Sequence, residues 1–289
     1  MAQHPSSPLM ANLAGLPVGD TAPVRIMAVL NVSPESFYRG SVRTDLGQLV
    51  ETAQIMAGAG ADIIDLGAMS TAPYLKTWIS EEEEADRLAQ AVQAVAARVT
   101  IPISADTKRA TPAAAALAAG ARIINDVSGL KNDPRMAGII AAADVGVILM
   151  ASEATPSNGT PVDRVSVALE ESLHLATQAG IAQKRIVLDP GIGFFRQPEV
   201  LWHEWDCIVL RKLAALRKFG RPLLVGVSRK SFIGKILDQP DAADRLVGSL
   251  ACAAIAVNNG AHIIRAHDVK ATVEAVRMAE RLRPLLIQE

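Results

Sequence analysis

The feature that most constrains the fold of this chain is a regular alternation, from residue 25 onward, of short aliphatic runs with longer Ala- and Leu-rich stretches. The short β-branched runs are typical of buried strands, and the longer stretches are typical of helices. Eight such pairs follow one another, and a strand that is followed each time by a crossover helix pairs in parallel with its neighbours. The sequence therefore predicts an α/β protein that folds as a single (β/α)8 barrel, a TIM barrel.

The expected elements can be placed along the chain by their residue pattern. The strands are expected at 25–31, 62–67, 101–106, 122–127, 145–150, 185–189, 223–227 and 262–266. The helices are expected at 45–59, 80–98, 110–119, 133–143, 163–179, 198–219, 243–258 and 269–284. Ser80 with Glu83 forms a capping box, so the acidic run 81–84 is interpreted as a helix start and not as a catalytic cluster. Glycines are expected to end five helices in a left-handed conformation, at Gly60, Gly120, Gly180, Gly220 and Gly260.

The length of the chain fits one such domain. A closed α/β barrel needs about 250 residues, and this chain has 289. Half of them are apolar and only 3% are aromatic, so the core must be built from Ala, Val, Ile and Leu. We expect residues 25–289 to form the barrel, and residues 1–24, rich in Pro, Ser, Gly and Ala, to form a flexible arm that is not a signal peptide.

Composition also argues against several classes of partner. The net charge is −1 and no basic stripe is present, so we expect no nucleic-acid partner. No segment has the roughly 18 uninterrupted apolar residues that a membrane-spanning helix needs, so we expect no membrane partner. Cys207 and Cys252 stand alone in apolar helical patterns, which favours buried free thiols and a reducing cytoplasm.

Polar residues interrupt the ends of nearly every expected strand. They are Asn31, Asp65, Asp106, Asn125, Asp126, Asp189, Ser228, Arg229, Lys230, Arg265 and His267. A single strand-end Asn or Asp is usually a turn former, but in a parallel barrel all of these ends meet at one mouth, where active sites lie. Arg265 and His267 are two apart and so point the same way, and the loops after strands seven and eight commonly bind phosphate. We therefore expect an anion site beside a set of buried carboxylates.

Six segments resemble, in order and spacing, the signature segments of dihydropteroate synthases. They are LNVSPESFY (30–38), ISADT (103–107), IINDVSG (123–129), DPGIGF (189–194), SRKSFIG (228–234) and RAHDV (265–269). DPGIGF and SRKSFIG together are highly specific, whereas NVSPESF or IND alone would also suit related pterin-binding methyltransferases. The resemblance spans about residues 25 to 270.

The resemblance implies a role for individual residues. It implies that the pterin ring is held by Asp106, Asn125, Met150, Asp189 and Lys230, and that diphosphate is held by Asn31, Arg265 and His267. Carboxylate and amide groups can satisfy the adjacent donors and acceptors of a pterin edge. Asp106, Lys230, Arg265 and His267 form the implied catalytic set, and no side-chain nucleophile is expected.

The remaining implied partners are a metal ion, an arylamine and a second subunit. Dense negative charge on the leaving diphosphate calls for Mg²⁺, which takes few protein oxygens, and Asn31 is its implied ligand. The arylamine is expected to contact Thr71, Pro73, Phe194, Lys230 and Ser231. The resemblance also suggests a homodimer formed through the late helices.

The segment STAPY (70–74) departs from the bacterial pattern Ser-Thr-Arg-Pro-Gly, since Ala72 replaces an arginine that would contact diphosphate or para-aminobenzoate. The pattern after strand five departs as well, because Ala151 stands where the bacterial pattern has histidine. Together with NVSPESFYRGS, STAPY looks more like the archaeal-type branch. Three functions therefore stay open beside folate synthesis: condensation with an aminobenzene riboside in methanopterin synthesis, pterin binding in a methyltransferase, and an inactive pterin-binding paralogue.

Overall fold

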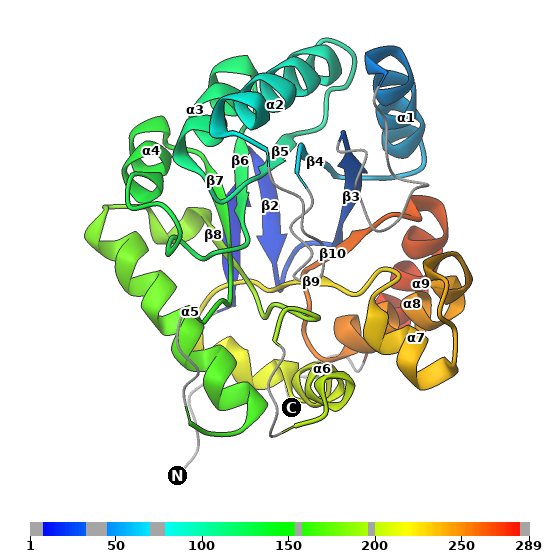
Figure 1. Cartoon of the computed structure of the whole chain (residues 1–289). Helices are drawn as coiled ribbons and strands as arrows, with labels where there is room; N and C mark the ends of the chain where they lie inside the picture. The colour runs from blue at the N-terminus through cyan, green and yellow to red at the C-terminus, as the bar shows by residue number, and fades with distance from the viewer. Residues whose placement is uncertain (1–7, 33–44, 70–78, 154–157, 196–199, 284–289) are drawn as a thin grey trace.

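We describe a computed structural model of the chain, in which residues 8–32, 45–69, 79–153, 158–195 and 200–283 are placed well enough for description. Eight parallel strands lie inside a ring of helices (Figure 1). The strands are β3 (Arg25–Asn31), β4 (Ile63–Gly67), β5 (Ile103–Asp106), β6 (Ile123–Asp126), β7 (Gly146–Met150), β8 (Ile186–Asp189), β9 (Leu224–Gly226) and β10 (Ile263–Ala266). They pair in the order β8-β7-β6-β5-β4-β3-β10-β9, and a parallel bridge between Leu188 and Leu223 brings the two edges together. The predicted (β/α)8 barrel is confirmed.

The helices of the outer ring also follow the expected order. They are α1 (Leu46–Gly58), α2 (Glu81–Ala96), α3 (Ala110–Ala119), α4 (Met136–Ala143), α5 (Pro161–Gln178), α6 (Trp202–Arg211), α7 (Ser231–Leu237), α8 (Leu246–Asn258) and α9 (Val269–Leu282). Short 3₁₀ segments at Leu213–Phe219 and Ala242–Arg245 replace parts of two expected helices. None of the helices in the described part of the chain is long and apolar enough to cross a membrane.

Helix starts are set by local side chains. Ser80 accepts a hydrogen bond from the Glu83 backbone N–H and so caps α2 as expected. α5 begins earlier than expected, because Thr160 and Asp163 form a reciprocal capping box with Pro161 at the first helical position. α4 begins later, because the Asp133 side chain accepts from the Ala110 backbone N–H and thereby belongs to the start of α3.

The five glycines expected to end helices all have positive φ, between 67° and 122°. At Gly120 the value is 122°, and its N–H closes α3 on the Leu117 carbonyl. L residues with a Cβ avoid this region, so a glycine is the natural residue there.

The expected flexible arm requires correction for the residues that the structure describes. β1 (Met10–Leu13) and β2 (Leu16–Gly19) form an antiparallel hairpin. Leu13 and Val18 are fully buried against the barrel floor, which is formed by Met27, Ile63, Ile123, Ile148, Val187, Leu224 and Ile263. The sequence pattern missed the hairpin because its strands are only four residues long and turn at Ala14–Gly15, with no long run to mark them.

Polar contacts hold the hairpin to the floor. The Asp20 carboxylate accepts two hydrogen bonds from Arg217, at 2.9 and 2.8 Å, and lies 3.0 Å from Nε2 of His262. Nδ1 of His262 accepts from the Leu223 backbone N–H. Burial lowers the pKa of His262, although Asp20 acts in the opposite direction. The neutral ring is the form that can accept at one nitrogen and donate at the other.

Candidate active site

Strand register brings the expected site residues to one end of the barrel. Across neighbouring strands, Asn31 pairs with Gly67, Gly67 with Asp106, and Asp106 with Asn125. Met150 pairs with Asp189 in the same way. Parallel strands end on the same side, so these residues lie at the carboxyl-terminal mouth where barrel active sites form. A Cβ at position 67 would lie 3.1 Å from Oδ1 of Asn31, which is a tight contact, so glycine there leaves room for the Asn31 amide.

Arg265 joins two buried carboxylates from distant strands. Its Nε donates to Oδ2 of Asp65 and its Nη2 donates to Oδ2 of Asp106, each at 2.7 Å. Asn125 donates its amide to the same Asp65 oxygen at 3.1 Å. The other oxygens of Asp65 and Asp106 are buried and have no hydrogen-bond partner within the described residues. Because buried acceptors are rarely left unpaired, these two oxygens are available to a hydrogen-bond donor such as an N–H group of a ligand.

The electrostatics of this cluster follow from burial. Burial raises the pKa of Asp106 to about 7, and the nearby Arg265 guanidinium acts against that rise. Asp189 is also buried, which raises its pKa, while its hydrogen bond from the Gly191 backbone N–H acts in the opposite direction. Two carboxylates from opposite parts of the ring are thus kept in a region of low dielectric, where hydrogen bonds to a ligand are stronger than in water.

Lys230 lies against the loop that follows β8. Its ammonium donates to the Ile192 carbonyl and stands 4.5 Å from the centre of the Phe194 ring. Ser231, the first residue of α7, comes directly after it in the chain. Lys230 occupies the N-cap position of this helix and makes no side-chain capping bond. Thr71, Pro73 and Ala72, and with them the first-loop residues Arg39 and Arg43, lie outside the described residues.

Two basic side chains near the mouth, Arg229 and His267, have contacts that local sequence could not show. Arg229 is buried with a positive φ, and its guanidinium donates to both oxygens of Asp268 and to the Ala242 and Ala243 carbonyls. It is therefore part of the scaffold of the loop after β9. His267 lies beside Ser228, with Nδ1 2.9 Å from Oγ. Burial, together with the Arg265, Arg229 and Lys230 charges, lowers the pKa of His267 to about 3, so its ring is neutral at pH 7.

Three buried carboxylates make contacts that the sequence pattern did not predict. Asp65 appeared among the strand-end residues only, yet it is fully buried and shares Arg265 with Asp106. Glu84 accepts from the Thr107 hydroxyl at 2.6 Å and from Arg109 at 2.9 Å, and so it fixes the loop that follows Asp106. Asp206 accepts from the Gly193 backbone N–H at 2.7 Å. The signal for Glu84 and Asp206 was a carboxylate on the apolar face of a helix, spaced with buried Leu88 in α2 and Val209 in α6.

The donor set at the mouth fits a magnesium ion held largely by substrate and water. No group of three or more His, Cys, Asp or Glu residues with metal-binding geometry occurs in the described part of the chain. Asn31 places an amide oxygen beside the Gly67 and Asp106 strand ends. Mg²⁺ keeps several water ligands and commonly takes only one or two protein oxygens beside substrate phosphates, so a single amide oxygen is compatible with it.

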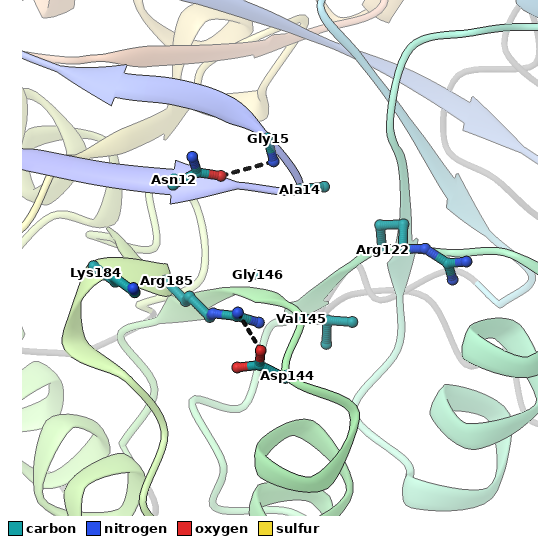
Figure 2. Close-up of a pocket in the computed structure, with 9 residues that line it drawn as sticks. All are labelled: Asn12, Ala14, Gly15, Arg122, Asp144, Val145, Gly146, Lys184 and Arg185. Carbon is teal, nitrogen blue, oxygen red and sulfur yellow. Dashed lines mark hydrogen bonds and ion pairs between the residues drawn. The ribbon is translucent and has the colours of Figure 1, made fainter.

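A cavity of about 320 Å³ lies at the other end of the barrel and is separate from this site (Figure 2). It lies between the hairpin tip, the start of β7 and the 3₁₀ segment Gln183–Arg185. Figure 2 shows Arg185 paired with Asp144, while Arg122 extends on the far side of Val145. The charged groups do not converge on one point, and we assign this cavity no ligand.

The fold and the mouth together define a (β/α)8-barrel protein with a buried polar network at the carboxyl ends of its strands. The family model described as "Pterin binding enzyme" matches residues 27–267. The chain is 40% identical over 270 residues to the dihydropteroate synthase of Escherichia coli, covering 90% of this chain and 92% of the relative. It is 38% identical over 279 residues to that of Synechocystis, covering 92% and 94%.

Solved structures agree with the sequence relatives. The dihydropteroate synthase of Xanthomonas albilineans with 4-aminobenzoic acid has a TM-score of 0.85 at 32% identity, with 96% of this chain and all of that chain covered. The chain therefore belongs to the pterin-binding enzymes and, within them, to the dihydropteroate synthase family, and it is a transferase of folate biosynthesis.

Proposed function

We propose that the chain condenses 6-hydroxymethyl-7,8-dihydropterin diphosphate with para-aminobenzoate, giving 7,8-dihydropteroate and diphosphate. The observation that carries this proposal is the buried network of Asp65, Asp106, Asn125 and Arg265 at the barrel mouth. In this network, Oδ1 of Asp65 and Oδ1 of Asp106 are buried acceptors that suit the N–H groups of an aminopyrimidinone ring. The name of the Xanthomonas albilineans structure includes 4-aminobenzoic acid, and that of a Clostridium difficile structure at 35% identity includes pteroic acid.

In this proposal the pterin ring enters the mouth between two groups of residues. Asp106 and Asn125 meet it from β5 and β6, and Asp189 meets it from β8, where Met150 is the paired residue. Lys230 approaches the ring carbonyl from the side of the β8 loop. Buried acceptors and an ammonium donor on opposite sides would fix the ring in one orientation, because a turned ring would leave buried polar groups unpaired.

The diphosphate would extend from the ring toward Asn31, Arg265 and His267. Two of the five N–H donors of Arg265 are already used by Asp65 and Asp106, so a contact with diphosphate would use the remaining donors on Nη1 and Nη2. His267, which is neutral, would act through hydrogen bonding and not through charge. A bound Mg²⁺, with Asn31 as its protein ligand, would neutralise charge on the leaving diphosphate.

The bond changes need no nucleophilic side chain. The C–O bond between the pterin methylene and diphosphate breaks, the arylamine nitrogen forms the new C–N bond, and the amine loses a proton. Positive charge left on the pterin would be stabilised by the Asp106 carboxylate, whose pairing with Arg265 favours its ionised form. The arylamine would lie near Phe194, Lys230 and Ser231, together with Thr71 and Pro73.

The alternative nucleophile, an aminobenzene riboside, rests on Ala72 and its neighbours, which lie outside the described residues. The test is to incubate the purified chain with the pterin diphosphate, Mg²⁺ and each amine separately, and to identify products by mass spectrometry. Dihydropteroate with para-aminobenzoate is the expected result. A ribosylated product alone would place the chain in methanopterin synthesis, and pterin binding without any product would identify a pterin-binding protein that is not a synthase.

We also propose that the chain forms a homodimer in the cytoplasm. Large apolar side chains are exposed on α8 and α9, namely Val247, Ile255, Met278 and Leu282, and these two helices pack against each other. Large apolar side chains exposed on neighbouring helices are typical of a subunit interface. The two cysteines are free thiols, as a reducing compartment requires.

A further inference from the structure

The loop after β8 forms the surface against which Lys230 rests, and its own hydrogen bonds include one from the Phe194 N–H to the Gly191 carbonyl and one from the Gly191 N–H to Asp189. Gly191 and Gly193 both have positive φ, of 73° and 84°. Glycine is conformationally free in both halves of the φ range, so a segment with two such residues needs outside contacts to hold one shape. The source of those contacts therefore decides where the Lys230 ammonium lies.

Three consecutive residues of this loop fix Lys230. The Ile192 carbonyl accepts from its ammonium. Gly193 lies so close that a Cβ there would be 2.9 Å from Cδ of Lys230. The Phe194 ring has the ammonium 4.5 Å from its centre, within range of a cation–π contact. A shift of the loop backbone would therefore move Lys230 with it.

A buried contact that holds this loop comes from α6. Oδ1 of Asp206 accepts from the Gly193 backbone N–H at 2.7 Å, and the Asp206 side chain is fully buried. Burying a carboxylate costs free energy unless it is hydrogen-bonded. The hydrogen bond from the Gly193 N–H offsets part of that cost for Asp206, and it anchors the loop to α6.

A second contact holds the far end of the loop. The Phe195 ring stacks on Trp205, the neighbour of Asp206, with the ring centres 5.1 Å apart. The Arg164 guanidinium covers the Trp205 ring at 4.8 Å and is paired with Glu153. The loop is thus fixed to α6 at Gly193 and at Phe195.

We propose that Asp206 is a positioning residue for the pterin site, acting on Lys230 through the Gly193 backbone N–H. Asp206 touches no substrate in this proposal. Its effect is to hold the loop backbone at residues 192–194 so that the Lys230 ammonium faces the ring. The proposal rests on the proposed function, because it assumes that Lys230 binds the pterin.

The test is a double-mutant cycle on pterin affinity, measured by calorimetric titration with 6-hydroxymethyl-7,8-dihydropterin. Asp206→Leu keeps the side-chain size but removes the acceptor, and we expect it to raise Kd about tenfold, as expected for a buried donor left unpaired. Asp206→Asn keeps an acceptor at the same position, and we expect its Kd to stay within about threefold of the wild type. Glu204→Leu, an exposed carboxylate on the same helix, is the matched control and should leave Kd unchanged.

To separate positioning from simple stabilisation, the pterin Kd of Asp206→Leu is also measured in the Lys230→Met variant. If Asp206 acts through Lys230, Asp206→Leu should change Kd by less than about twofold in that background, since interacting residues are non-additive. The same tenfold loss in both backgrounds would overturn the proposal, and so would an equally weak Asp206→Asn variant. Should Asp206→Leu not fold, Asp206→Ser, whose hydroxyl is too short to reach Gly193, replaces it in the cycle.

Failure of this inference is distinguishable from failure of the proposed function. A wild-type chain that binds no pterin and makes no dihydropteroate contradicts the function itself. A wild type that binds and turns over normally, with additive effects at Asp206 and Lys230, contradicts only the positioning role.

Discussion

At the scale of single residues, the main feature of the barrel mouth is a set of buried charged side chains. Asp65 and Asp106 are buried carboxylates that share one guanidinium, from a residue 200 and 159 positions away in the chain. Asp189 stands apart from them with a backbone partner at Gly191. Removing a charge should therefore have different consequences in the two places, because only Arg265 has charged partners that would be left behind.

For Asp189, we expect Asp189→Ala to abolish pterin binding while the barrel stays folded. Among the described residues the side chain accepts from one backbone N–H, that of Gly191, so its loss should lower stability by about 1 to 3 kcal/mol. Calorimetric pterin titration together with a melting curve measures both effects. Asp189→Asn is the control that keeps the Gly191 acceptor but not the charge, and unchanged affinity in Asp189→Ala would show that the residue is only a turn former.

For Arg265, we expect Arg265→Ala to lower the free energy of unfolding by about 3 to 5 kcal/mol at pH 8, because buried carboxylates lose their partner. The loss should shrink toward pH 5. Without Arg265 the pKa of Asp106 rises further, so the folded state binds more protons than the unfolded state and gains stability as pH falls. Urea unfolding at the two pH values tests this, and an equal loss at both would contradict the assigned charge pairing.

The same variant also tests the ligand contact. If the remaining donors of Arg265 reach the diphosphate, Arg265→Ala should weaken pterin diphosphate more than 6-hydroxymethyl-7,8-dihydropterin, by an extra factor of about ten or more. Titrating both ligands into the variant and the wild type gives the comparison. Equal losses for the two ligands would make Arg265 a residue of the scaffold alone.

At the scale of elements, the hairpin of β1 and β2 closes the end of the barrel opposite the mouth. Leu13 lies fully buried among the floor residues, and it packs so tightly on β7 that a Cβ at Gly146 would lie 2.8 Å from Cδ2 of Leu13. The hairpin therefore belongs to the barrel core although it precedes the first barrel strand.

We accordingly expect Leu13→Ala to lower the free energy of unfolding by about 2 to 5 kcal/mol, the range for a large-to-small change in a packed core. Because the floor is at the end of the barrel opposite the active site, kcat/KM well below the melting temperature should stay unchanged. Met10→Ala, on the same strand but 41% exposed, is the matched control. A Leu13→Ala variant as stable as the Met10→Ala variant would contradict a role for the hairpin in the core.

At the scale of the whole molecule, the distribution of exposed apolar side chains is uneven. Val247, at 77% exposure, and Leu282, at 72%, lie on neighbouring helices late in the chain. The mouth opens at the carboxyl ends of the strands, so a subunit interface on these helices would leave it accessible.

We expect Val247→Glu to convert a dimer into a monomer, because a charge at the centre of an apolar interface must be desolvated without a partner. Sedimentation velocity across a range of concentrations measures the change. Val167→Glu, an exposed valine on α5, is the control and should leave the dimer intact. A wild-type chain that sediments as a monomer at all concentrations would contradict the proposed assembly.

Much of this molecule is readable from sequence because the information is local. Hydrophobic periodicity placed all eight barrel strands and the order of their helices, and strand ends in a parallel barrel must meet at one mouth. The positions of Asp106, Asn125 and Asp189 at that mouth follow from the same rule. The short hairpin strands carried too weak a pattern to be recognised, and their burial depends on a floor supplied by distant strands.

The sequence by itself thus determined the (β/α)8 barrel, the end of the barrel that carries the chemistry and the family to which the chain belongs. Only the tertiary structure decided which charges meet. It paired Arg265 with Asp65 and Asp106, turned Arg229 onto Asp268, left His267 neutral and brought Asp206 to the loop that holds Lys230. The physical reason is that backbone conformation follows largely from neighbouring residues, whereas ionisation and hydrogen bonding depend on distances and burial that arise when segments far apart in the chain come together.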